Sequence, residues 1–202
     1  MLSEGEKKVY LALYLNKEGL HVREICRISG LTLPAVSKHL ENGEKEGRLT
    51  IQTKGNMKIC RLNFGSPGIA PLIQTIELDR LKKLPHAARE SFTSFISDLN
   101  EKPLMSIVFG SFAKGSSSKA SDLDILLVFQ RLDSRLMKSV EDSARKIKGR
   151  TGVSIQPVCL AYPEFEKEIL GRENEFMKDI RKNGMALKGH DLYLNLLGRF
   201  YG

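Results

Sequence analysis

The sequence predicts an α+β protein with two folded parts, the first made of helices and a β-hairpin and the second of strands and helices. Three observations lead to this fold class. Apolar residues recur at helical spacing between residues 4 and 46, and alternating apolar and polar residues surround Gly55-Asn56. Two later apolar runs, 104–109 and 123–129, have the length and bounding signals of buried strands.

Three helices are expected first, over residues 4–16, 21–29 and 32–46. Gly30 ends the second helix. Thr32 is a good N-cap for the third, and Pro34 falls in its first turn, where a missing N–H costs nothing. Two helices joined by a short turn with glycine have the outline of a helix-turn-helix.

The segments 48–53 and 57–62 alternate around a Gly-Asn turn and predict a β-hairpin, which turns the helix-turn-helix into a winged helix. The stretch 35–41, Ala-Val-Ser-Lys-His-Leu-Glu, followed by Glu-Lys-Glu-Gly at 44–47, resembles the recognition helix of ArsR/MarR-type regulators. That resemblance implies major-groove contacts to double-stranded DNA from Thr32, Ala35, Ser37 and Lys38, and backbone contacts from Lys54, Asn56 and Lys58. Winged helices also bind proteins or serve as spacers, so both alternatives stay open.

Gly65-Ser66-Pro67-Gly68 is the clearest linker. Two helices, about 69–84 and 86–99, follow the linker, and each carries an apolar stripe. These stripes either cover the winged helix, pack on the later sheet or form the interface of a homodimer. We therefore expect domains at 1–66 and 101–202, joined by a helical connector at 67–100.

Residues 110–124 carry the most informative motif, a Gly-Ser pair, a loop of small polar residues and then Asp-Leu-Asp at the head of an apolar run. Gly110-Ser111 lies where a strand ends and a helix begins, a place that favours phosphate. Asp122 and Asp124 leave the same face of a strand, and a hard cation such as Mg²⁺ relieves their repulsion. This is a pattern for nucleotidyl transfer.

The motif resembles the signature of the minimal nucleotidyltransferases in the DNA-polymerase-β-like superfamily, and Ala113, Gly115 and Ser121 also fall where that family tends to carry them. The resemblance implies a small mixed sheet flanked by helices, a triphosphate held by Gly110 and Ser111, and Mg²⁺ held by the catalytic pair Asp122 and Asp124. The plainer interpretation is a surface loop whose Asp-x-Asp caps a strand.

Active members of that superfamily usually carry a third acidic residue on a later strand. The best later strand here, 153–160, holds no acid, and Gln156 or Ser154 occupies the expected position. An amide cannot act as a base at neutral pH. Glu164 and Glu166 lie beyond, in a predicted helix, and substitute only if the chain folds back suitably.

The remaining segments are predicted to be mostly helical. Residues 134–148 form a basic amphipathic helix. Five basic residues on this helix and just after it either steer a polyanion or make a solvated face: Lys138, Arg145, Lys146, Lys148 and Arg150. Helices follow at 162–170 and 174–182, and the apolar tail 187–200 packs back. Its segment 188–192 resembles the closing segment of related small transferases.

Composition adds broad limits. The net charge of +8 suits a polyanionic partner. The three cysteines, Cys26, Cys60 and Cys159, show no metal-ligand spacing, and no apolar run approaches a membrane span. The start of the sequence lacks the apolar stretch of a signal peptide, so a cytoplasmic protein is expected.

Two functions fit these observations. In the first, a DNA-binding protein carries a Mg²⁺-dependent nucleotidyltransferase domain that binds an NTP such as ATP. It passes a nucleotide to a protein or small-molecule hydroxyl, for instance on a partner toxin protein, as in the antitoxins of the resembling family. In the second, a transcription regulator uses a non-catalytic transferase domain as a nucleotide sensor. The missing third carboxylate favours the second function, and the intact Gly-Ser and Asp pair favours the first.

Overall fold

The structure is a computed structural model that describes residues 2–55, 57–118 and 120–202. The chain divides into two compact units, one of Met1–Ile76 with Leu197–Gly202 and one of Glu77–Leu196. The division therefore falls inside the segment expected as a connector, and the last residues of the chain belong to the first unit. The two units are described separately below.

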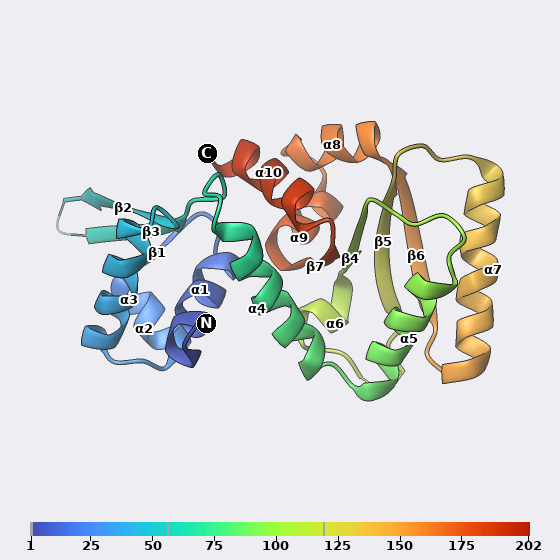
Figure 1. Ribbon diagram of the computed structural model, residues 1–202, viewed down its shortest axis with the longest axis horizontal. Helices are drawn as coiled ribbons and strands as arrows, with labels where there is room; N and C mark the ends of the chain where they lie inside the picture. Colours follow the sequence, from blue (N-terminus) through green and yellow to red (C-terminus); the bar gives the residue numbers. More distant parts are fainter. Residues whose placement is uncertain (1, 56, 119) are drawn as a thin grey trace. The chain divides into compact units, whose positions relative to one another are not determined.

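The first unit holds, within the described residues, three helices and a three-stranded antiparallel sheet (Figure 1). The helices are α1 (Glu4–Leu15), α2 (Val22–Ser29) and α3 (Leu33–Lys45). The strands are β1 (Leu20–His21), β2 (Leu49–Lys54) and β3 (Met57–Leu62), in the order β1-β3-β2. The predicted helices and hairpin are thus present, and β1 is a two-residue strand that the sequence analysis did not anticipate.

Local signals set the ends of these helices. The Ser3 side chain accepts a hydrogen bond from the Glu6 N–H at 3.2 Å, which caps α1. Gly30 ends α2 with φ +68°, a left-handed conformation that suits glycine. Thr32 occupies the N-cap of α3 as expected, but its side chain makes no capping hydrogen bond.

Apolar residues from all three helices and the sheet bury together in this unit. Val9, Leu13, Ile25, Val36 and Leu40 are each at most 2% exposed. Because these residues recur at helical spacing, one face of each helix turns inward and the opposite face stays in solvent.

The second unit contains a four-stranded mixed sheet in the order β6-β5-β4-β7, as far as the structure describes it. The central pair β4 and β5 is antiparallel, β7 pairs antiparallel with β4, and β5 pairs in parallel with β6 through a helical crossover. The strands are β4 (Met105–Val108), β5 (Leu123–Phe129), β6 (Ile155–Ala161) and β7 (Met185–Lys188). The helices are α4 (Ile69–Lys83), α5 (His86–Asp98), α6 (Gly110–Lys114), α7 (Ser134–Thr151), α8 (Tyr162–Leu170), α9 (Glu175–Asn183) and α10 (His190–Tyr201), of which α4 begins and α10 ends in the first unit.

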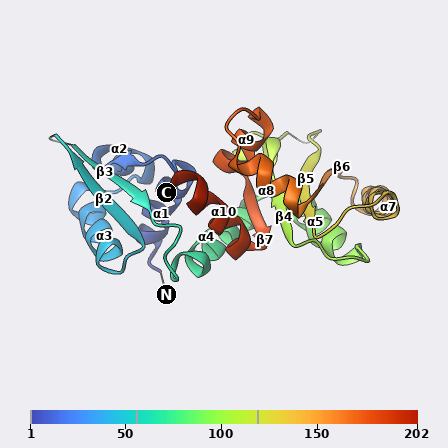
Figure 2. The ribbon, with the colours of Figure 1, turned by 90° about the horizontal axis from the view of Figure 1, so that it is seen from above.

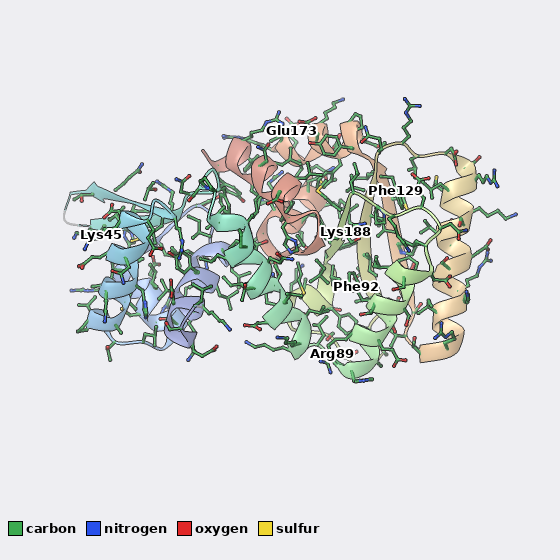
Figure 3. The ribbon with its side chains drawn as sticks, viewed as in Figure 1. Lys45, Arg89, Phe92, Phe129, Glu173 and Lys188 are labelled. Atoms are coloured by element: carbon green, nitrogen blue, oxygen red, sulfur yellow. The ribbon has the colours of Figure 1, made fainter. Side chains whose placement is uncertain are left out.

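The two faces of this sheet are covered by different helices. Alternate residues of β5 (Leu123, Ile125, Leu127 and Phe129) pack with α5 and α7 in one apolar core, which includes Phe92 (Figure 3). Figure 2 shows α5 on one side of the sheet and α8 and α9 on the other. Because side chains alternate along a strand, Asp124 belongs to the face opposite this core.

Strand β7 was not predicted: its last two residues fall in the expected apolar tail 187–200, and its first two lie between that tail and the expected helix 174–182. Its four residues, Met-Ala-Leu-Lys, carry no alternating pattern, and pairing with β4 makes them a strand. No helix within the described ranges is both long and apolar enough to cross a membrane.

Candidate functional site

The Gly-Ser motif lies at the turn between β4 and the single-turn helix α6. Phe109 donates its N–H to the Asp124 carbonyl oxygen at 3.1 Å, so this turn is tied to the first residues of β5. Gly115 ends α6 with φ +71°, and the Ser116 N–H bonds to the Ser111 carbonyl at 3.0 Å. The motif is therefore a compact turn that brings residues fifteen apart in sequence into contact.

Gly110 is required at its position for two reasons. Its φ is +66°, which side chains rarely adopt. A Cβ atom there would lie 3.1 Å from the Asp124 Cγ and closer still to Oδ2. The backbone of Gly110 therefore lies directly against the Asp124 carboxylate, an approach that only glycine allows.

Asp122 and Asp124 form a pair of like charges. Asp122 is exposed just before β5, and Asp124 is partly buried within it. Partial burial, together with the nearby Asp122 carboxylate, raises the pKa of Asp124 above its ordinary value. The two carboxylates therefore interact unfavourably when both are ionised.

The pair suits a divalent cation. Among the described residues, neither carboxylate forms an ion pair with a lysine or arginine. Carboxylate oxygens are hard ligands of the kind that Mg²⁺ prefers, and Mg²⁺ commonly takes its other ligands from phosphate and water. No cluster of three or more His, Cys, Asp or Glu side chains suited to a metal occurs in the described part of the chain.

The loop before the carboxylates is ordered by its serines. The Ser118 N–H donates to the Ser121 Oγ at 2.8 Å, and the Ser121 N–H returns a bond to the Ser118 carbonyl at 3.2 Å. These bonds close a small turn immediately before Asp122. Ser121 therefore helps to position the first carboxylate.

Gln156 lies beside the carboxylate pair. In the parallel register of β5 and β6, Asp124 is the partner of Gln156, so both side chains leave the same face of the sheet. Ser154 lies one step before β6, where its carbonyl accepts the Leu123 N–H at 2.8 Å. The position expected for a third carboxylate therefore holds a neutral amide.

The suggestion that Glu164 or Glu166 substitutes for that carboxylate is wrong. Both residues belong to α8, which begins after β6 has run seven residues away from the Asp pair. At about 3.3 Å per residue, the strand separates α8 from Gln156 by roughly 20 Å. The chain does not fold back in the way that this alternative needs.

Arg80 supports the motif from α4 and was not identified from the sequence. Its guanidinium pairs with the fully buried Glu77 at 2.9 Å and donates to the carbonyls of Ala113 and Asn183, each at 3.0 Å. It therefore joins the end of α6 to the end of α9. Nothing local in the sequence marks this role, because each of its partners but Glu77 is distant along the chain.

The predicted DNA-contacting residues lie on α3 and the hairpin of the first unit. Thr32 and Lys38 are exposed, Ala35 and Ser37 are partly buried, and Lys58 is exposed on β3. Lys54 is the last residue of β2. Asn56 lies outside the described residues.

Comparison with known proteins supports part of this interpretation. Residues 93–181 match the family described as "Polymerase beta, Nucleotidyltransferase". No curated protein and no solved structure gave a match. The matched segment contains the Gly-Ser turn, both aspartates, Gln156 and the strands β4, β5 and β6. Residues 93–181 of this chain are therefore similar to the nucleotidyltransferase domain of the polymerase β kind.

Proposed function

We propose that the second unit binds a nucleoside triphosphate with Mg²⁺ and transfers its nucleotide to a hydroxyl group. The contact between the Gly110 backbone and the Asp124 carboxylate carries this proposal. It brings the two halves of the motif, one suited to phosphate and one to a cation, into a single site. The family match over residues 93–181 supports the same reaction class.

Each group in the site has a defined part. The backbone of Gly110-Ser111 and the Ser111 hydroxyl hold the phosphates, and Asp122 and Asp124 hold Mg²⁺. A bound Mg²⁺ would supply charge stabilisation for the triphosphate. The acceptor oxygen bonds to the α-phosphorus, the bond to the β-phosphate breaks, and pyrophosphate leaves with the electron pair. Since Gln156 cannot accept the hydroxyl proton, that proton passes to water.

Label transfer tests the proposal. Purified protein is incubated with Mg²⁺, each α-³²P-labelled NTP in turn and lysate of its own host as acceptor. We expect label on a protein or metabolite, with ATP as the preferred donor, and no label with the Asp122→Asn/Asp124→Asn variant. The same double variant should lose Mg²⁺-dependent nucleotide binding in calorimetry. Unchanged affinity would remove the aspartates from the site.

A nucleotide sensor is the second candidate, and Gln156 is the observation that favours it. Two-metal phosphoryl transfer stabilises both the attacking and the leaving oxygens, and an amide at this position weakens that arrangement. A sensor binds the NTP with Mg²⁺ but transfers no label. The Gln156→Asp variant separates the two candidates, since the appearance of transfer only in that variant identifies the natural protein as a sensor.

For the first unit we propose binding to double-stranded DNA through α3, with the hairpin on the phosphate backbone. The order of its elements, the exposed Lys38 on α3 and the exposed Lys58 on β3 support this proposal. The net charge of +8 is consistent with a polyanionic partner. Fluorescence anisotropy with labelled duplex DNA at several salt concentrations tests it, because phosphate contacts make the affinity fall with salt.

A further inference from the structure

A cleft of about 530 Å³ opens beside the proposed site. The reaction described above gives this cleft no ligand. It lies among the start of α5, the loop before Asp122 and the segment after α7, and we call it the serine-lined cleft. Asp122 lines it, whereas Gly110, Ser111 and Asp124 do not. A molecule in this cleft therefore meets the carboxylate pair from the Asp122 side alone. Its volume is within the usual range for small-molecule sites.

One wall of the cleft is apolar. Ala87 and Ala88 of α5, Phe112 of α6 and Val153 after α7 supply this wall. Ala88 and Phe112 are themselves part of the buried core, at 1% and 5% exposed, so the wall is fixed by packing. A rigid wall of small residues and one ring accommodates the carbon skeleton of a small molecule.

Among the residues that the structure describes, the polar lining has hydroxyl groups and one cation. Ser117 and Ser154 line the cleft, and within the described residues their hydroxyls form no hydrogen bond to the protein. Lys148 is the cation of the lining, and it forms no ion pair with any described residue. Hydroxyls recognise ligand hydroxyls in either direction, and a lysine ammonium binds phosphate as a point charge.

The start of α5 adds donors to the same cleft. Pro85, at the N-cap, has no side chain that accepts a hydrogen bond, and the first turn of α5 contains no acidic residue. The first-turn N–H groups at Ala87 and Ala88 are therefore not capped by a side chain. These donors and Lys148 together make the polar side of the cleft favourable to an anion.

We infer that the serine-lined cleft binds the acceptor, and that this acceptor is a small phosphorylated polyol or sugar. Its phosphate lies at Lys148, its carbon skeleton lies on the apolar wall, and one free hydroxyl lies at Asp122. This inference rests on the proposed function. The hydroxyl oxygen bonds to the α-phosphorus of the NTP, pyrophosphate leaves, the proton passes to water and a phosphodiester is the product.

Calorimetry on the full chain tests the inference with glycerol 3-phosphate, ribose 5-phosphate and glucose 6-phosphate as probes. We expect at least one of them to bind with a millimolar or lower Kd, and uncharged glucose not to bind. Lys148→Gln should raise that Kd about tenfold, equivalent to the loss of one charge-assisted contact. The matched control is Lys138→Gln, which removes the same charge elsewhere on α7 and should change the Kd less than about twofold.

A second variant blocks the cleft without altering charge. Ala87 is exposed, so Ala87→Phe adds a ring to the cleft from the surface of α5. It should abolish binding of the probes while the melting temperature and Mg²⁺-ATP binding stay at wild-type values.

Three results would overturn the inference. They are the absence of binding by all three probes, equal losses in Lys148→Gln and Lys138→Gln, and competition between the bound probe and a non-hydrolysable ATP analogue. Competition would assign the cleft to the nucleotide itself. Failure of the proposed function is seen separately, because then the ATP analogue itself does not bind in an Mg²⁺- and Asp122-dependent way.

Discussion

Substituting Gly110 by alanine tests whether the contact between the phosphate turn and Asp124 is essential. Gly110 has a left-handed backbone conformation, with φ +66°, and the substitution would add a Cβ atom to it. This conformation costs a non-glycine residue about 1–2 kcal/mol. The second unit spans the 120 residues from Glu77 to Leu196, so the melting temperature should fall by roughly 4–10 °C.

The same substitution also displaces the carboxylate. The new Cβ would lie 3.1 Å from the Asp124 Cγ and nearer to Oδ2, so the carboxylate must withdraw by about 1 Å to reach an ordinary contact distance. A displacement of that size in a binding or catalytic group commonly costs around a hundredfold. We therefore expect Mg²⁺-ATP affinity, measured by calorimetry, to fall by about ten- to a hundredfold.

Gly115→Ala is the matched control. Gly115 has a similar φ, +71°, but an added Cβ meets nothing within 4 Å. It should lower the melting temperature by a similar amount and leave Mg²⁺-ATP affinity within about threefold of the wild type. If Gly110→Ala and Gly115→Ala bind Mg²⁺-ATP equally well, the close approach of Gly110 to Asp124 has no role in binding.

Three further outcomes are expected. Arg80→Met leaves the buried Glu77 carboxylate without this partner and should lower the free energy of unfolding in urea by about 3–5 kcal/mol, whereas Arg145→Met breaks an exposed ion pair and should cost less than about 1 kcal/mol. Asp124→Asn should stabilise the cation-free protein by less than about 1 kcal/mol at neutral pH. Because the pKa of Asp124 is raised in the folded state, its ionised form destabilises the fold. The gain in stability from Asp124→Asn should therefore shrink as the pH falls through the raised pKa. A gain that stays constant down to acid pH contradicts the like-charge explanation. Lys38→Ala should weaken DNA binding and lower the salt slope of log K by about one, and an unchanged slope would exclude Lys38 from phosphate contact.

The sequence determined the elements whose signals are local. Gly30, Pro34 and Gly55 set the ends of helices and strands through their own backbone preferences, and the apolar run 123–129 matches β5 residue for residue. The Gly-Ser and Asp-x-Asp motif could be identified from the sequence because it, too, is a local signal. Its chemistry depends on residue types at a fixed spacing, and the family match over 93–181 agrees with it.

Other features depend on pairing between distant segments, and only the tertiary structure decided them. β7 becomes a strand because it pairs with β4, and Gln156 lies beside Asp124 because of the β5–β6 register. Glu164 is excluded from the carboxylate site because β6 runs parallel to β5, so α8 begins at the end of the sheet far from Asp124. A register fixes which side chains share a face. Because a helical crossover and not a tight turn joins β5 to β6, no turn residues set this register.

The serine-lined cleft and the Arg80 anchor have the same origin. Arg80 reaches carbonyls 33 and 103 residues away in sequence, and the cleft gathers side chains from α5, the motif loop and the end of α7. The sequence identified Lys148 only as one of several basic residues on a helix. Its place beside Asp122 in one cleft is a consequence of how the helices pack on the sheet, and that packing turns an ordinary surface charge into a candidate ligand-binding group.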